Sequence, residues 1–251
     1  MTTIGTPSDQ LAVSATRDFP FYNDQPVHVS GARWLMVMGG VVLGAAADLL
    51  VDVPGPGWLG ILVRAVLFAG IPLTVYALAI PGHWKSIFHR VGVRDVGLML
   101  GIAVLNVLVT FGVGLLTSAA LHASPNPMNG ALREMSLGDR LLTFASMVPQ
   151  LLGEEVFTIL PLLAILWVAV NKLHLSRRAG IVIAWIASAV IFALLHLPTY
   201  NWNLLQCLLI IGTARLVLSV AYLVTKNIWV STGAHVLNDW TLFGLALLTA
   251  H

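Results

Sequence analysis

The chain has 251 residues and a formal net charge of +2; 58% of its residues are hydrophobic and only 10% are charged. Soluble domains carry about 25% charged residues, so this composition excludes an ordinary soluble domain. The small net charge gives no support for a nucleic-acid partner, and the single cysteine, Cys207, excludes an internal disulfide or a cysteine-based metal site. Repeated apolar runs of about 20 residues predict an all-α transmembrane helix bundle in a lipid bilayer.

Seven apolar segments are long enough to span the membrane, and the count rises to eight if one of them contains a re-entrant turn. We expect spans at 33–53, 58–80, 96–119, 142–170, 179–197, 204–224 and 228–249, after a polar and mobile N-terminal tail over residues 1–32. The fourth segment is too long for a simple span. Pro149 predicts a break there, between an interfacial helix at 137–149 and a span that begins near residue 150.

Small residues repeat at a spacing of four in two of the spans. The stretches are GVVLG at 40–44 and GLMLG at 97–101. Because small residues let the backbones of membrane helices approach each other, both stretches predict close helix packing.

The positions of Lys and Arg predict the orientation of the bundle. Basic residues gather in the loops 81–95 and 171–178 and in the turn at 225–227. With seven spans these three connections lie on the same side as the N-terminal tail, and the other connections carry less positive charge. The positive-inside rule then predicts a cytoplasmic N-terminus.

Two adjacent carboxylates, Glu154 and Glu155, lie inside the apolar segment QLLGEEVFTI. A charged side chain inside a membrane span costs about 2–3 kcal/mol or more, so each one requires a physical reason. Neighbouring helix residues point about 100° apart, which lets one carboxylate face a cavity while the other meets a neighbouring helix. The pair suits a general base that acts on water. It also suits a structural pair that Arg215 or a histidine neutralises.

Polar side chains also lie in two later spans. The segment FALLHLP contains His196 one helical turn after Phe192, and the segment GAHVLNDW places His235 and Asp239 on one helix face, with Asn238 about 60° to the side. About 40 residues separate each of these groups from the next, so three different helices of a bundle carry them and can converge. Each imidazole alone also suits a polar contact between helices.

These side chains allow two kinds of chemistry. Two imidazoles and one or two carboxylates, without cysteine, suit Zn²⁺ with an open coordination position, and the candidate ligands are Glu155, His196, His235 and Asp239. The same set suits a metal-free site in which a glutamate activates water beside a histidine. The residues leave both alternatives open.

The three motifs resemble the CPBP intramembrane proteases, also called the Abi or CAAX-protease family. That family carries Glu-Glu-x-x-x-Arg, then Phe-x-x-x-His, then His-x-x-x-Asn/Asp on successive membrane helices, and this chain has EEVFTI at 154–159, FALLH at 192–196 and HVLND at 235–239. The resemblance covers residues 140–245. It implies that Glu154 is the general base, that His196 helps to activate water, and that Glu155 supports the base. It further implies that His235 and Asp239 stabilise the oxyanion or bind a metal.

The chain departs from the family pattern at two positions. Ile159 replaces the arginine of the first motif, and we hypothesise that Arg215 supplies the missing cation. Asp239 stands where asparagine would donate to an oxyanion, and an ionised carboxylate only accepts hydrogen bonds. Asp239 must therefore be protonated, orient His235 or bind a cation.

The resemblance implies an intramembrane endopeptidase that acts on a peptide or membrane-protein substrate, such as a bacteriocin precursor or a lipid-modified tail. We expect N-terminal helices over 33–135 and a catalytic core over 136–251, in a bacterial plasma membrane. The alternatives are a non-catalytic immunity or interaction protein and a proton-coupled transporter. One difficulty concerns depth: His196 falls near the outer end of its span and His235 nearer the inner end of its own, so the helices must tilt or shift for the two imidazoles to meet.

Overall fold

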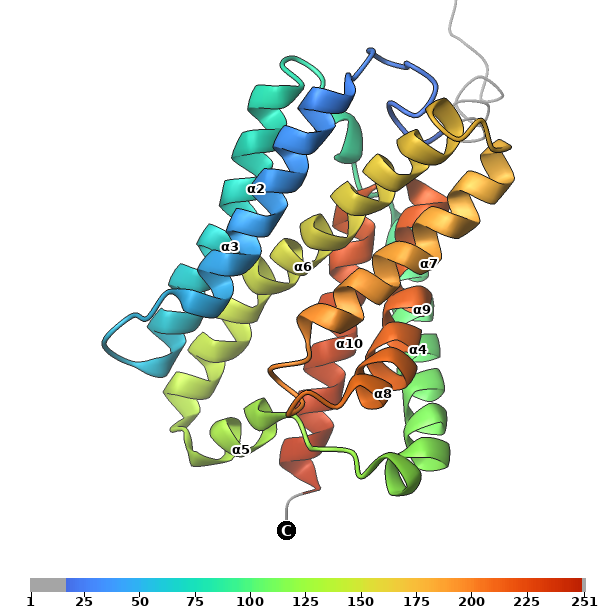
Figure 1. The fold of residues 1–251 in the computed structure, drawn as a ribbon. Coiled ribbons are helices and arrows are strands. Elements are labelled where there is room, and N and C mark those ends of the chain that lie inside the picture. The colour runs from blue at the N-terminus through green and yellow to red at the C-terminus, as the bar shows by residue number, and fades with distance from the viewer. Residues whose placement is uncertain (1–16, 250–251) are drawn as a thin grey trace, which may run out of the picture.

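The computed structural model describes residues 17–249, and within them it is all-helical, as predicted (Figure 1). The α-helices are α2 (Gly31–Leu50), α3 (Gly57–Ala79), α4 (Val93–Leu121), α5 (Pro127–Glu134), α6 (Leu137–Asn171), α7 (Arg177–Leu195), α8 (Leu204–Gln206), α9 (Gly212–Thr225) and α10 (Ile228–Leu248). A 3₁₀ turn, η1 (Trp84–Ile87), follows α3, and a π-helical turn, η2 (Cys207–Ile211), joins α8 to α9.

Six helical segments within the described residues are long and apolar enough to cross a membrane, and they coincide with the first six predicted spans to within a few residues. The seventh predicted span corresponds to α10, a helix of 21 residues. Its length is sufficient, but His235, Asn238 and Asp239 make it more polar than the other six. The seventh span therefore stays a prediction.

Helix α6 is the central element of the bundle, and it runs obliquely through the whole molecule in Figure 1. On one side it packs against α3, which pairs with α2; on the other it contacts α7 and α10. Helix α4 lies on the far side of α10 and α9. The long motif helix thus contacts both other motif helices, α7 and α10, directly.

The predicted break at Pro149 is wrong, because α6 continues as one helix of 35 residues through Pro149 and Pro161. A proline removes one backbone donor, but neighbouring helices that pack around a membrane helix stabilise it despite the missing hydrogen bond. Helix α6 is the most buried of the candidate spans. Met147, which precedes Pro149, lines the same cavity as Glu154 in the middle of the helix.

Close packing at glycine is found in one of the two predicted places. A methyl group on Gly40 would lie 2.7 Å from Val75 Cβ, so α2 and α3 approach each other there as predicted. Gly97 and Gly101 on α4 have no such neighbour, because that face of α4 meets no other helix, and the second prediction is wrong. A close contact that the sequence pattern did not indicate joins α6 to α3, where a methyl group on Gly153 would meet the Phe68 ring at 2.6 Å.

Residues 17–30 require a correction to the predicted polar tail. Phe19, Phe21, Tyr22 and Val29 are buried against the bundle, so this part of the segment is packed. Phe21 contacts the rings of Trp34 and Tyr76 edge-on. The apolar side chains explain the packing, since burial of an aromatic ring is strongly favourable. Residues 1–16, the rest of the predicted mobile tail, lie outside the described residues.

An ion pair holds this segment at the start of α7. The Arg177 guanidinium donates to both carboxylate oxygens of Asp18, and the Tyr22 hydroxyl donates to Asp18 Oδ2 at 2.6 Å. Burial opposes ionisation of Asp18, but the hydrogen bonds from Arg177, Tyr22 and the Phe19 backbone outweigh it and lower the pKa of this carboxyl.

We predict that Asp18→Asn loosens residues 17–30, measured as faster amide hydrogen exchange in this segment. Because the pKa of Asp18 is lowered, its stabilising effect is present at neutral pH and is lost as the pH falls below about 4. The control is Asp24→Asn, since Asp24 contacts His28 within the same exposed turn and makes no ion pair with the bundle. Equal exchange in the two variants would contradict the prediction.

Candidate active site

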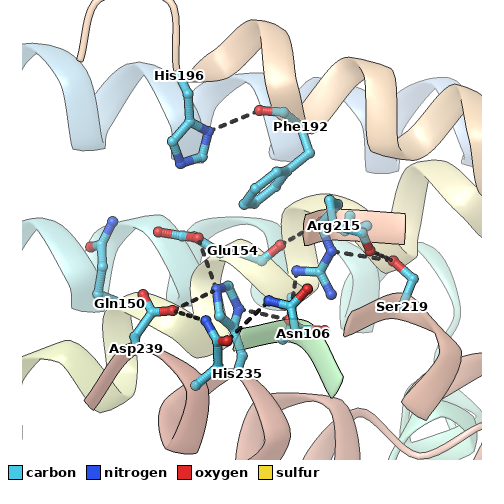
Figure 2. Close-up of polar contacts among 12 residues, drawn as sticks. Asn106, Gln150, Glu154, Phe192, His196, Arg215, Ser219, His235 and Asp239 are labelled. Carbon is cyan, nitrogen blue, oxygen red and sulfur yellow. Dashed lines mark hydrogen bonds and ion pairs between the residues drawn. The ribbon is translucent and has the colours of Figure 1, made fainter. Parts of the chain in front are cut away.

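One cavity of about 710 Å³ is lined by polar residues from all three motifs. Residues from helices α2 to α7, α9 and α10, including the turn after α7, line it. The predicted site residues among them are Glu154, His196, Arg215, His235, Asn238 and Asp239. Figure 2 shows His196 and Phe192 on one side of Glu154 and the pair His235 and Asp239 on the other.

A buried ion pair lies behind the cavity. Arg215 Nη1 donates to Glu155 Oε1 at 2.6 Å, and both side chains are fully shielded from solvent. Arg215 Nε also donates to Ser219 Oγ at 3.2 Å, and its guanidinium lies 5.1 Å from the centre of the Phe192 ring. The cation that the first motif lacks at Ile159 therefore comes from α9, as hypothesised from the sequence.

Glu155 also fixes the orientation of His235. The Nδ1 atom of His235 lies 2.9 Å from Glu155 Oε1, and since a carboxylate accepts hydrogen bonds, Nδ1 carries the proton that it donates. The Nε2 atom then points to the cavity side, 3.7 Å from Glu154 Oε2 and 3.6 Å from Asp239 Oδ1. A ring held in this way presents one defined nitrogen to a ligand.

His196 is oriented by its own helix. Its Nδ1 atom lies 2.9 Å from the Phe192 carbonyl oxygen, which can only accept, so Nδ1 is the donor (Figure 2). In the neutral ring Nε2 is then the acceptor. The Phe192 ring lies between the two imidazoles, with its centre 4.5 Å from that of His196 and 6.4 Å from that of His235.

The predicted difficulty of depth is resolved by tilt. Helix α7 ends at Leu195, so His196 is the residue that follows its last turn. In Figure 1, α6 and α7 cross the bundle obliquely relative to α10. The end of α7 therefore comes level with the middle of α6 and α10, and His196 lines the same cavity as Glu154 and His235.

Two further groups belong to the cavity but were not predicted as site residues. Asn106, fully buried on α4, donates from Nδ2 to Asn238 Oδ1 at 3.0 Å, and Asn238 Nδ2 donates to Asp239 Oδ1 at 2.8 Å. Gln150, one turn before Glu154 on α6, donates to Asp48 on α2 at 3.3 Å. A polar side chain in an apolar run is the only sequence signal for either group.

The described residues contain no group of three His, Cys, Asp or Glu side chains placed to hold a metal ion. Of the four predicted ligands, Glu155 lies behind His235, where its Oε1 accepts from both Arg215 and His235. The remaining three line the cavity. The donor types suit zinc, but their arrangement does not form a zinc site, so no chemical step is derived through a metal.

The comparison with protein families supports the prediction made from the motifs. Residues 137–241, from the first residue of α6 to the middle of α10, match the model of the family described as type II CAAX prenyl endopeptidase Rce1-like. The match covers this segment only, and it confirms the predicted resemblance to the CAAX proteases there. No curated protein and no solved structure matches the chain.

We predict that Arg215→Met lowers the free energy of unfolding by about 3–5 kcal/mol, because it leaves the Glu155 carboxylate buried without a counter-charge. The measurement is denaturant unfolding in detergent. The double variant Arg215→Met/Glu155→Gln should recover most of this loss, since it removes both charges. Arg177→Met serves as the control, because its ion pair is half-exposed and should contribute at most about 1 kcal/mol. A double variant no more stable than the single one would contradict the prediction.

Proposed function

We propose that this protein is an intramembrane endopeptidase that hydrolyses a peptide bond with a water molecule activated by Glu154. The observation that carries the proposal is the convergence of Glu154, His196 and His235, from three separate helices, on one cavity inside an apolar bundle. The family match over α6 to α10 supports the same reaction class.

The twin glutamates take different roles in this proposal. Glu155 Oε1 accepts from Arg215 and His235, and the fully buried Glu155 side chain does not line the cavity. Glu154 lines the cavity. Among the described residues its carboxylate makes no hydrogen bond, and it lies 3.7 Å from His235 Nε2. Glu154 is therefore the carboxylate that is free to accept a proton from water.

The attacking water would lie between Glu154 and His196. The lone pair of His196 Nε2 accepts one hydrogen of this water, while Glu154 takes the other proton as the oxygen attacks the scissile carbonyl. Glu154 then returns that proton to the leaving amine, and the C–N bond breaks.

His235 would stabilise the oxyanion of the tetrahedral intermediate. Glu155 holds its Nδ1–H, and a proton on Nε2 gives a second donor aimed at the cavity. Asp239 Oδ1 lies 3.6 Å from Nε2, on the cavity side of the ring. This assigns Asp239 to the orientation of His235 and not to direct donation, which an ionised carboxylate cannot provide.

The size of the cavity supports a peptide substrate. A volume of about 710 Å³ is within the usual range for a bound organic ligand and accommodates a few peptide residues. We propose a peptide segment in or near the bilayer as substrate, such as a lipid-modified tail, a bacteriocin precursor or a loop of another membrane protein. The basic connections 81–95, 171–178 and 225–227 all precede α10, so the positive-inside rule favours a cytoplasmic N-terminus whether or not α10 spans the bilayer.

The missing arginine at position 159 was the main support for a non-catalytic immunity or interaction protein. Since Arg215 supplies a cation to Glu155 from α9, this support is weakened. A proton-coupled transporter predicts proton flux in liposomes that depends on Glu154 and requires no peptide cleavage.

We predict that Glu154→Gln lowers kcat/KM for peptide cleavage by about 10²- to 10⁴-fold, because the amide cannot accept the proton from water. The assay is mass spectrometry of a peptide library incubated with the protein in liposomes. The control is Glu134→Gln, since Glu134 is exposed on α5 and lies outside the cavity. Both variants should melt at the wild-type temperature. Full cleavage by Glu154→Gln would assign the base to another residue.

We predict that cleavage persists after dialysis against a strong chelator and that the purified protein holds no stoichiometric zinc, because the cavity residues are not arranged as a zinc site. Elemental analysis and the peptide assay before and after dialysis test this. The prediction is contradicted if the protein loses one equivalent of metal together with its activity and recovers the activity when Zn²⁺ is added. His196, His235 and a carboxylate would then have to move together to bind the ion.

A further inference from the structure

Helix α4 lies outside the family-matched segment, yet it presents two polar side chains to the cavity. Asn106 and Thr110 are four residues apart, so they share one face of the helix, and both line the cavity. Most of the remaining α4 surface is apolar and exposed, and α4 is the least buried of the six candidate spans within the described residues. Neither residue belongs to a motif.

The direction of the hydrogen bonds fixes the amide of Asn106. Asp239 Oδ1 accepts, so the atom of Asn238 that contacts it at 2.8 Å is the donor Nδ2. Asn238 Oδ1 is then the atom that faces Asn106 at 3.0 Å, so Asn106 donates from Nδ2. The Asp239 carboxylate thus determines, through Asn238, that Oδ1 is the Asn106 atom without a hydrogen-bond partner.

The atom that remains is a hydrogen-bond acceptor. Asn106 Oδ1 and Thr110 Oγ1 are both inaccessible to solvent and have no hydrogen-bond partner within residues 17–249. Buried polar atoms in native proteins nearly always have a partner, and an unmatched one is unfavourable. Since both side chains line the cavity, the missing partner is a ligand that reaches these two atoms once the groups covering them move aside.

The spacing of Asn106 and Thr110 along α4 matches the spacing of backbone N–H groups in an extended peptide. Residues four apart on a helix are separated by about 6 Å along its axis. In an extended strand, backbone N–H groups on one side recur every second residue, at about 6.6 Å. A peptide that lies along α4 can therefore direct one N–H to Asn106 Oδ1 and the next on that side to Thr110 Oγ1.

We propose that Asn106 and Thr110 form a subsite that binds the backbone of an extended peptide substrate through its N–H groups. This inference rests on the proposed function, because it takes the cavity to be a peptide site. Neutral acceptors recognise the backbone regardless of side chains. Asn106 additionally joins this subsite to Asp239, and through it to the side of His235 that faces the cavity.

The test compares peptides in which single backbone amides are replaced by esters, which removes one N–H at a time. In the wild type we expect esters at two positions, two residues apart, to lower kcat/KM by about three- to tenfold each. In Thr110→Val one of the two penalties should disappear, and in Asn106→Leu the other. Thr117→Val is the matched control, because the Thr117 hydroxyl donates to the Val113 carbonyl of its own helix and should leave both penalties unchanged.

Dissociation constants of the same peptides for Glu154→Gln protein repeat the comparison without turnover. Cleavage with equal ester penalties in every variant would overturn the subsite alone, and would indicate that water satisfies the two atoms. Peptide binding that shows the expected penalties without any cleavage by the wild type would overturn the proposed function and leave the subsite standing. Failure of every peptide to bind would overturn both. Thr110→Val changes one hydroxyl to a methyl group, so it keeps the test valid if Asn106→Leu does not fold.

Discussion

The buried ion pair between Arg215 and Glu155 is the contact on which the rest of the site depends. It joins α9 to α6, and since Glu155 Oε1 also accepts from His235, a single carboxylate oxygen connects three helices. A charge inside a membrane protein is tolerated when an opposite charge and hydrogen bonds replace its hydration. The pair therefore allows an ionised carboxylate to stand behind the imidazole that faces the cavity.

The need for two adjacent glutamates follows from this arrangement. Neighbouring helix positions point about 100° apart, so Glu155 turns toward Arg215 while Glu154 turns into the cavity. One carboxylate orients a histidine and the other remains available for a proton. Gly153 directly precedes the two glutamates. Because it has no side chain, the Phe68 ring of α3 packs against the α6 backbone, and the two helices approach closely beside Glu154.

Prediction from the sequence succeeded where a local pattern has one physical meaning. Apolar runs of sufficient length gave the positions of six spans, and the three motifs predicted the resemblance that the family match supports and most of the polar side chains that line the cavity. It failed where the outcome depends on neighbours. Pro149 continues its helix because other helices surround it, and Gly97 and Gly101 pack against nothing because no helix covers that face of α4. Asn106 was not predicted as a site residue, because a single asparagine in an apolar run forms no motif with a characteristic spacing.

The amino-acid sequence by itself determined that the chain is a many-helix membrane protein and which ionisable groups its apolar segments contain, since hydrophobic length and residue type are local properties. Only the tertiary structure decided which glutamate faces the cavity, which cation replaces the one absent at Ile159, and how His196 comes level with His235. These outcomes depend on helix tilt and on contacts between residues 60 and 80 positions apart, which packing of the whole bundle determines.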